Sequence, residues 1–112
     1  MGYDLSFTKV DKRKIKNTKD PFWDMREAYI DDICSYSNVI KKIVTKYNWF
    51  DTEYHEISPE QLQEIIIFLK DKIKHGKYTD SDDRHMTNYV CDRLQHWLPL
   101  KDYETIYYEE SY

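Results

Sequence analysis

The chain has 112 residues and a formal net charge of -4, a size that suits one domain with one core. Hydrophobic residues make up 40% of it and aromatic residues 16%, which excludes a disordered chain despite 34% charged residues. Two glycines and three prolines are too few for a many-stranded sandwich or barrel. We therefore expect a single α+β domain over residues 1–112, mostly helical, with three to four helices packed on a small antiparallel sheet formed by the N- and C-terminal strands.

The first elements along the chain are a short strand and a long helical region. "GYDLSFTK" alternates apolar and polar residues, as a strand with one buried face does. "VDKRKIKNTK" then predicts a loop or a solvated strand end. Asp20 and Pro21 resemble a helix start. Apolar residues at three- and four-residue intervals then predict one long helix, or two with a break near Ser37, over residues 21–48: Tyr29, Ile30, Ile33, Ile40, Ile43, Val44 and Tyr47.

The second half of the chain predicts two helices and a closing strand. Ser58 and Gln61 form a capping box, and Gly76 is placed for a left-handed C-terminal cap, which predicts a helix between them. "EYHEI" before it can add a strand. A further helix is expected over about residues 82–98, and residues 103–108 predict a strand paired with the first, with Ile106 turned inward.

Several residues suggest chemistry, but none forms a convincing enzyme motif. His85, Asp92 and His96 share one stripe of the predicted last helix, yet the two histidines would lie roughly 16 Å apart, too far to share a metal. This stripe remains an alternative site for a small enzyme or metal protein. Cys34 and Cys91 are expected as reduced core thiols. We expect no enzyme activity, no metal and no cofactor.

Charge is distributed unevenly along the chain. Residues 1–19 hold six basic and two acidic side chains, a local charge of +4, so the remaining residues carry -8. A basic arm over residues 9–19 is therefore an alternative nucleic-acid-binding site, with Lys12, Arg13, Lys14 and Lys16 as phosphate contacts.

Tyrosines and carboxylates are concentrated at the C-terminal end and in one turn. Tyrosine gives a large contact area with a polar tip, and neighbouring carboxylates suit a basic target. The predicted partner-binding residues are Tyr103, Glu104, Tyr107, Tyr108, Glu109, Glu110 and Tyr112, together with Asp80, Asp82 and Asp83.

The opening "MGYDLSF" resembles the start of many small proteins encoded by bacteriophages and other mobile elements of bacteria. A short, acidic, tyrosine-rich chain is also similar in general character to phage anti-CRISPR proteins. That resemblance implies an inhibitor that occupies nucleic-acid sites or blocks a conformational change of an RNA-guided nuclease. The leading expectation is therefore a non-enzymatic inhibitor that binds a basic groove of a larger host protein in the bacterial cytoplasm, without contact with a membrane.

Overall fold

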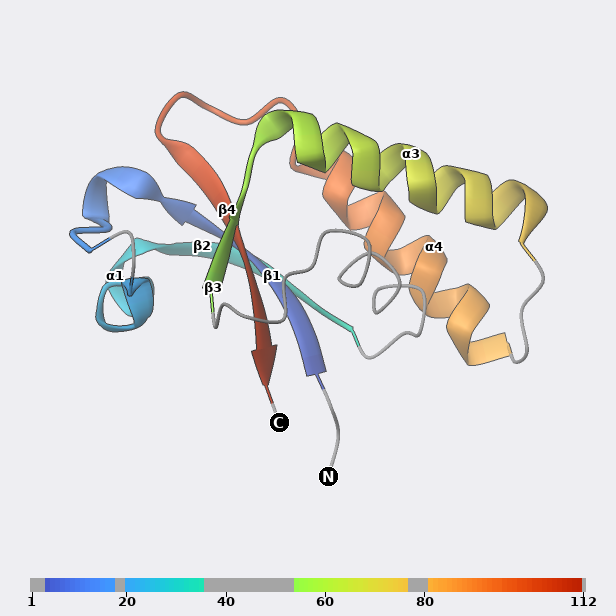
Figure 1. Cartoon of the computed structure of the whole chain (residues 1–112), viewed down its shortest axis with the longest axis horizontal. Helices are drawn as coiled ribbons and strands as arrows, with labels where there is room; N and C mark the ends of the chain where they lie inside the picture. Colours follow the sequence, from blue (N-terminus) through green and yellow to red (C-terminus); the bar gives the residue numbers. More distant parts are fainter. Residues whose placement is uncertain (1–3, 18–19, 36–53, 77–80, 112) are drawn as a thin grey trace.

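The computed structural model describes residues 4–17, 20–35, 54–76 and 81–111. Four strands form one antiparallel sheet in the order β2-β1-β4-β3. Two long helices cover one face of this sheet, while the short α1 lies at the other end of the molecule (Figure 1). The α+β class is therefore confirmed, with a larger sheet than the two or three strands expected.

The central strands are the first and last of the chain. β1 (Asp4–Asp11) pairs with β4 (Glu104–Ser111) over its whole length, from Asp4 opposite Ser111 to Asp11 opposite Glu104. The predicted pairing of the two terminal strands is confirmed, and Figure 1 shows the start of β1 beside the end of β4. β3 (Tyr54–Ile57), at the predicted third strand, pairs with β4. β4 is consequently an interior strand and not an edge.

The helix predicted from residue 21 onward is wrong for the described part of that region. Asp20 accepts from the amide of Phe22 as expected of a cap, but it caps only the 3-10 turn η2 (Pro21–Trp23), followed by the four-residue α1 (Met25–Ala28). The chain then forms strand β2 (Tyr29–Ser35) beside β1. The isoleucines of this segment suit both helix and strand, and pairing with β1 decides between them. Residues 36–48 lie outside the described residues.

The two helices predicted in the second half are confirmed, with small differences at their ends. α3 (Pro59–His75) begins at the Ser58–Gln61 capping box, and α4 (Ser81–His96) ends two residues earlier than expected. Gly76 ends α3 with φ of -74°, so the expected left-handed cap is wrong. Its amide instead donates to the carbonyl of Lys72 in an extended conformation.

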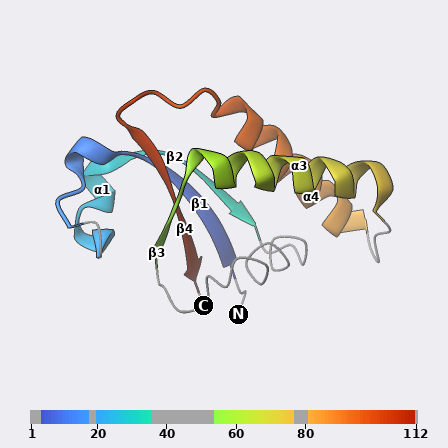
Figure 2. The same cartoon turned by 45° about the horizontal axis from the view of Figure 1, so that its top comes forward.

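The sheet separates two apolar clusters. The larger one lies between the sheet and the helices, which pack against each other on that face in both views (Figures 1 and 2). The smaller one lies on the opposite face under the turn formed by η1 (Lys12–Lys14), η2 and α1, and it contains Val10, Ile15, Ala28 and Tyr107. Side chains of alternating strand residues therefore enter different clusters, as the pleat requires.

Candidate functional site

The tyrosines of β4 are core residues, which corrects their predicted role in partner binding. Tyr107 is 2% exposed and Tyr108 0% exposed. Tyr108 packs edge-to-face on Phe7 in the larger cluster, with ring centroids 5.7 Å apart, whereas Tyr107 enters the smaller cluster. Both are buried because β4 is an interior strand with apolar residues packed against both faces. Neither ring is accessible to a partner.

Among the other predicted partner-binding residues, the three whose side chains the structure describes do not form one surface: Tyr103, Glu104 and Glu109. The Glu104 carboxylate lies 3.6 Å from the Lys9 ammonium and is largely buried. Tyr103 is half-buried beneath the guanidinium of Arg13, whose carbon lies 4.1 Å from the ring centroid. Glu109 is half-buried in β4. The side chains of five further predicted residues lie outside the described part: Asp80, Asp82, Asp83, Glu110 and Tyr112.

The described part of the basic segment, residues 9–17, is folded against the body and is not a projecting arm. Lys9 belongs to β1, and the turn η1 begins directly after the last residue of β1. Arg13 forms a two-bond ion pair with Asp11, which raises the pKa of Arg13 and lowers that of Asp11. Four cationic side chains of the described part of this segment are exposed, and of these Arg13 is ion-paired: Lys12, Arg13, Lys14 and Lys16.

The histidine stripe lies on an exposed face of α4, but its members are divided between two shallow hollows. His85 and Asp92 border one hollow, and Asp92 and His96 border the other. The Nδ1 atom of His96 lies 2.7 Å from the Asp92 carbonyl oxygen and 3.7 Å from its carboxylate. No three His, Cys, Asp or Glu side chains converge as metal ligands within the described ranges.

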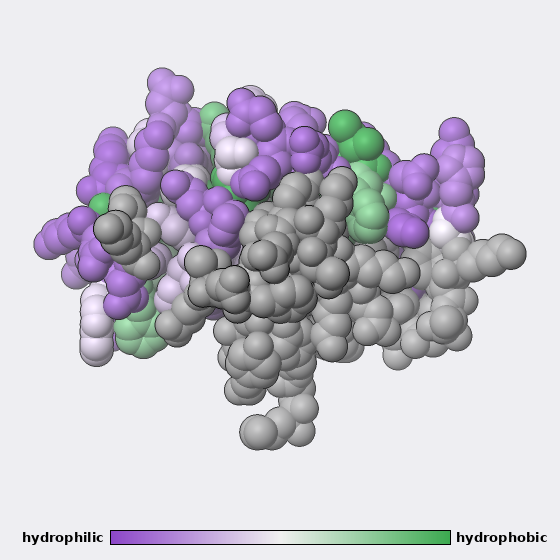
Figure 3. Space-filling model, viewed as in Figure 1, coloured by the Kyte–Doolittle hydropathy of each residue, from purple (hydrophilic) through white to green (hydrophobic). Residues whose placement is uncertain are grey.

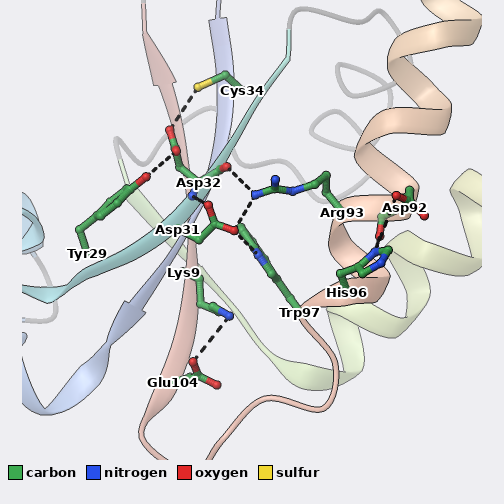
Figure 4. A network of polar contacts seen from close by, with 10 residues as sticks. All are labelled: Lys9, Tyr29, Asp31, Asp32, Cys34, Asp92, Arg93, His96, Trp97 and Glu104. Atoms are coloured by element: carbon green, nitrogen blue, oxygen red, sulfur yellow. Dashed lines mark hydrogen bonds and ion pairs between the residues drawn. The ribbon is translucent and has the colours of Figure 1, made fainter.

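Asp31 fastens the edge strand β2 to α4 (Figure 4). One of its carboxylate oxygens accepts from Arg93, at 2.5 Å, and from the Trp97 indole, at 3.0 Å, while the other accepts from the Asp32 amide. Burial acts to raise the pKa of Asp31, but the hydrogen bonds from Trp97 and the Asp32 amide and the charge of Arg93 outweigh it and lower that pKa. We call Asp31, Arg93 and Trp97 the α4 clamp.

The clamp also occupies polar backbone groups of β2 at Asp32. The backbone N–H of Asp32 donates to the Asp31 carboxylate, and the backbone carbonyl of Asp32 accepts from Arg93 at 3.4 Å. Free backbone groups on an outer strand invite pairing with another strand. Side chains therefore satisfy β2 at this position, where pairing with a further strand would otherwise be possible.

Asp32 has a different environment on the opposite face of the sheet. Its carboxylate accepts from the Tyr29 hydroxyl at 2.7 Å and from the Cys34 thiol at 3.4 Å (Figure 4). The hydrogen bond to Asp32 raises the pKa of Tyr29 to about 12, with burial and nearby carboxylates adding to the shift. Both donors are neutral, and no cation of the described residues forms an ion pair with Asp32. The Asp32 carboxylate therefore has no compensating cation among the described residues.

A hollow of about 380 Å³ lies beside this carboxylate, and we call it the Tyr29 hollow. Strand β1 contributes Thr8 to its lining, and α1 contributes Met25 and Arg26. On β1, Thr8 lies directly opposite Asp32 of β2, and Ser6, two residues before Thr8, lies opposite Glu109 of β4. The described residues that line it are Thr8, Met25, Arg26, Tyr29, Asp32 and Glu109.

Among the described residues, the most exposed aromatic side chains are Phe22 and Trp23, which we call the aromatic pair. Trp23 is 83% exposed and Phe22 52% exposed, with ring centroids 5.1 Å apart. Figure 3 shows pale side chains at the lower left, where Figure 1 places the η2–α1 region, next to strongly polar ones. Sequence reasoning missed this pair because it placed both residues inside a long helix. The signal was present: two aromatics directly after a capped proline, outside the apolar stripe.

The two cysteines differ, and only one is a core thiol as expected. Neither is joined in a disulfide; Cys91 is buried, which raises its pKa, whereas Cys34 is exposed on β2. Cys34 is exposed because the helix on which it was expected to face the core is a strand.

Comparison with known proteins gave no relative: no protein-family model, curated protein or solved structure matches this chain. Within the described residues, neither long helix has the length and apolar character needed to cross a bilayer.

Proposed function

We propose that this chain acts by binding and inhibits a larger protein, with the aromatic pair as the centre of its docking surface. The observation that carries the proposal is the 83% exposure of Trp23 next to the half-exposed Phe22. Soluble proteins usually bury much of a tryptophan, and tryptophan is enriched among residues that dominate binding energy. A tryptophan held in a short ordered turn loses little freedom on binding.

The charge around the aromatic pair favours a basic partner. Residues 20–32 contain five acidic side chains and one basic one, Arg26, so the segment has a local charge of -4. Asp20 and Asp24 also hold this turn in place, because Asp20 caps η2 and the Asp24 carboxylate accepts from the amides of Lys16 and Asn17. Aromatic anchors inside an acidic rim complement a positively charged groove.

A positively charged groove that normally holds nucleic acid is the partner surface that fits this chemistry. Carboxylates of the chain then stand where phosphates otherwise lie, and the partner loses access to its nucleic acid. A nucleic-acid-handling defence complex, such as an RNA-guided nuclease, is the partner class to which the anti-CRISPR resemblance of the sequence points. The docking surface differs from the one predicted on β4, and the proposed mechanism stays the same.

Affinity capture from a bacterial lysate with matched variants tests this proposal. Trp23→Ala removes the main anchor, while Ile67→Ala removes an apolar side chain that is 65% exposed on α3, away from η2. The expected result is a nucleic-acid-binding protein that is captured by the wild type and by Ile67→Ala, lost with Trp23→Ala, and released by added RNA or DNA. Equal capture by Trp23→Ala and the wild type would overturn the proposal, as would a captured protein that nucleic acid does not displace.

Direct binding of nucleic acid by the chain itself is the competing outcome. A salt-titrated shift assay with purified protein, DNA and RNA separates the two. Binding that disappears when Lys12, Lys14 and Lys16 are neutralised would assign the function to the basic turn and refute the proposal above.

A further inference from the structure

The geometry points to the Tyr29 hollow as a receptor for an arginine side chain of the partner. This inference rests on the proposed function, since it names the group that a basic groove would insert beside the aromatic pair. The hollow borders α1, which follows η2 directly in the chain. One basic surface can therefore cover the aromatic pair and the hollow together.

The hollow offers a guanidinium the three contacts that it prefers. Asp32 presents a carboxylate without an ion pair among the described residues, and a carboxylate can accept two parallel hydrogen bonds from arginine. Tyr29 is 51% exposed and supplies a ring for stacking. Met25 supplies an adaptable apolar contact for the methylene stem.

The carboxylate of Asp32 is oriented before any ligand arrives. The Tyr29 hydroxyl binds one oxygen at 2.7 Å and the Cys34 thiol binds the other at 3.4 Å. Each carboxylate oxygen has further acceptor capacity, so these two donors do not exhaust it. A fixed carboxylate loses less freedom on binding than one on a free side chain, which strengthens the contact.

The second carboxylate sets the charge of the hollow. Glu109 lines it from β4, with β1 between β2 and β4, so the two backbones lie roughly 10 Å apart. Two acidic residues and the single base Arg26 leave the lining at a charge of -1. A guanidinium between the two carboxylates is therefore attracted from both sides, while Arg26 limits the number of cations that can enter to about one.

Arginine fits better than lysine for geometric reasons. A planar guanidinium can stack on the Tyr29 ring and bind both oxygens of Asp32 at once, whereas an ammonium offers only a point charge. The hollow should therefore discriminate between the two cations, which a general acidic surface does not do.

Titration calorimetry with hexa-arginine and hexa-lysine peptides tests the inference directly. Asp32→Asn should weaken hexa-arginine binding roughly tenfold, as expected for loss of one charge-assisted pair. Glu27→Gln makes the same change of charge on an exposed α1 residue that does not line the hollow, and it should weaken binding less than about twofold. Tyr29→Ala should weaken binding a few-fold, while Tyr29→Phe, which keeps the ring but removes the hydroxyl that orients Asp32, should weaken it less.

Two results would overturn the inference: equal weakening by Asp32→Asn and Glu27→Gln, or equal affinity for the two peptides. Either would mean that only general electrostatic attraction operates. These outcomes are separate from the test of function, which depends on Trp23. If partner capture is lost with Trp23→Ala but Asp32→Asn leaves peptide binding unchanged, the arginine site is refuted and the proposed function is not. If Asp32→Asn weakens peptide binding but Trp23→Ala leaves partner capture unchanged, the proposed function is refuted and the arginine site is not.

Discussion

Replacing Asp31 by alanine should destabilise the fold by about 2 to 3 kcal/mol, because it removes the acceptor on which the α4 clamp depends. The Trp97 side chain is buried, so its indole N–H would be left without its acceptor at a cost of about 1–3 kcal/mol. The ion pair with Arg93 adds only about 0.5 kcal/mol, since its two side chains are 35% and 39% exposed and solvent screens them. The orphaned indole therefore dominates the loss.

Urea unfolding followed by far-ultraviolet circular dichroism measures this loss without depending on Trp97 emission. Asp31→Asn is the matched comparison, since it keeps the shape and one oxygen acceptor but loses the charge. We expect it to cost less than Asp31→Ala. A cost below about 0.5 kcal/mol for Asp31→Ala would refute the clamp as a stabilising contact.

The pH dependence of the stability of Asp31→Asn tests the electrostatic contribution of the Asp31 carboxylate. The pKa of Asp31 is lowered in the fold, so its ionisation stabilises the protein above the unfolded value of about 3.9. That contribution is lost as the pH falls through the lower folded value. The stability difference between the wild type and Asp31→Asn should therefore shrink in acid. A difference that stays constant from pH 7 to pH 2 would contradict the lowered pKa.

Three further predictions concern other parts of the fold. Ser58→Ala should cost about 1 kcal/mol in urea unfolding because it removes the capping box of α3, and an unchanged midpoint would contradict that role. Leu94→Ala in the larger cluster should cost about 2–5 kcal/mol, against less than about 0.5 kcal/mol for the exposed Ile67→Ala; similar values for both would place Leu94 outside the core. Because its pKa is raised to about 12, Tyr29 should ionise late in an absorbance titration, and its contribution to stability should be complete below pH 10 and lost as the pH rises toward 12. Asp32→Asn should shift the ionisation of Tyr29 toward pH 10. An unshifted titration would refute the hydrogen bond as the cause of the raised pKa.

Local signals in the sequence were sufficient for the elements that begin and end on their own residues. Ser58, Pro59 and Gln61 satisfy the first amides of α3 from within four residues, so its start needs no tertiary information. The alternation in β1 likewise predicted a strand. The terminal strands were expected to pair because each needs a partner for its backbone groups, and the β1–β4 register confirms this.

The sequence by itself determined the α+β class, both long helices and the pairing of the chain ends. Only the tertiary structure decided the nature of residues 21–35, because the hydrogen bonds that make β2 a strand come from β1, whose paired residues lie 19 to 30 positions earlier. It also decided where the candidate site lies. β4 is an interior strand with an apolar cluster on each face of the sheet, and these clusters bury Tyr107 and Tyr108. The short turn before β2 leaves Trp23 exposed. Both outcomes depend on neighbours distant in the chain, which local patterns do not encode.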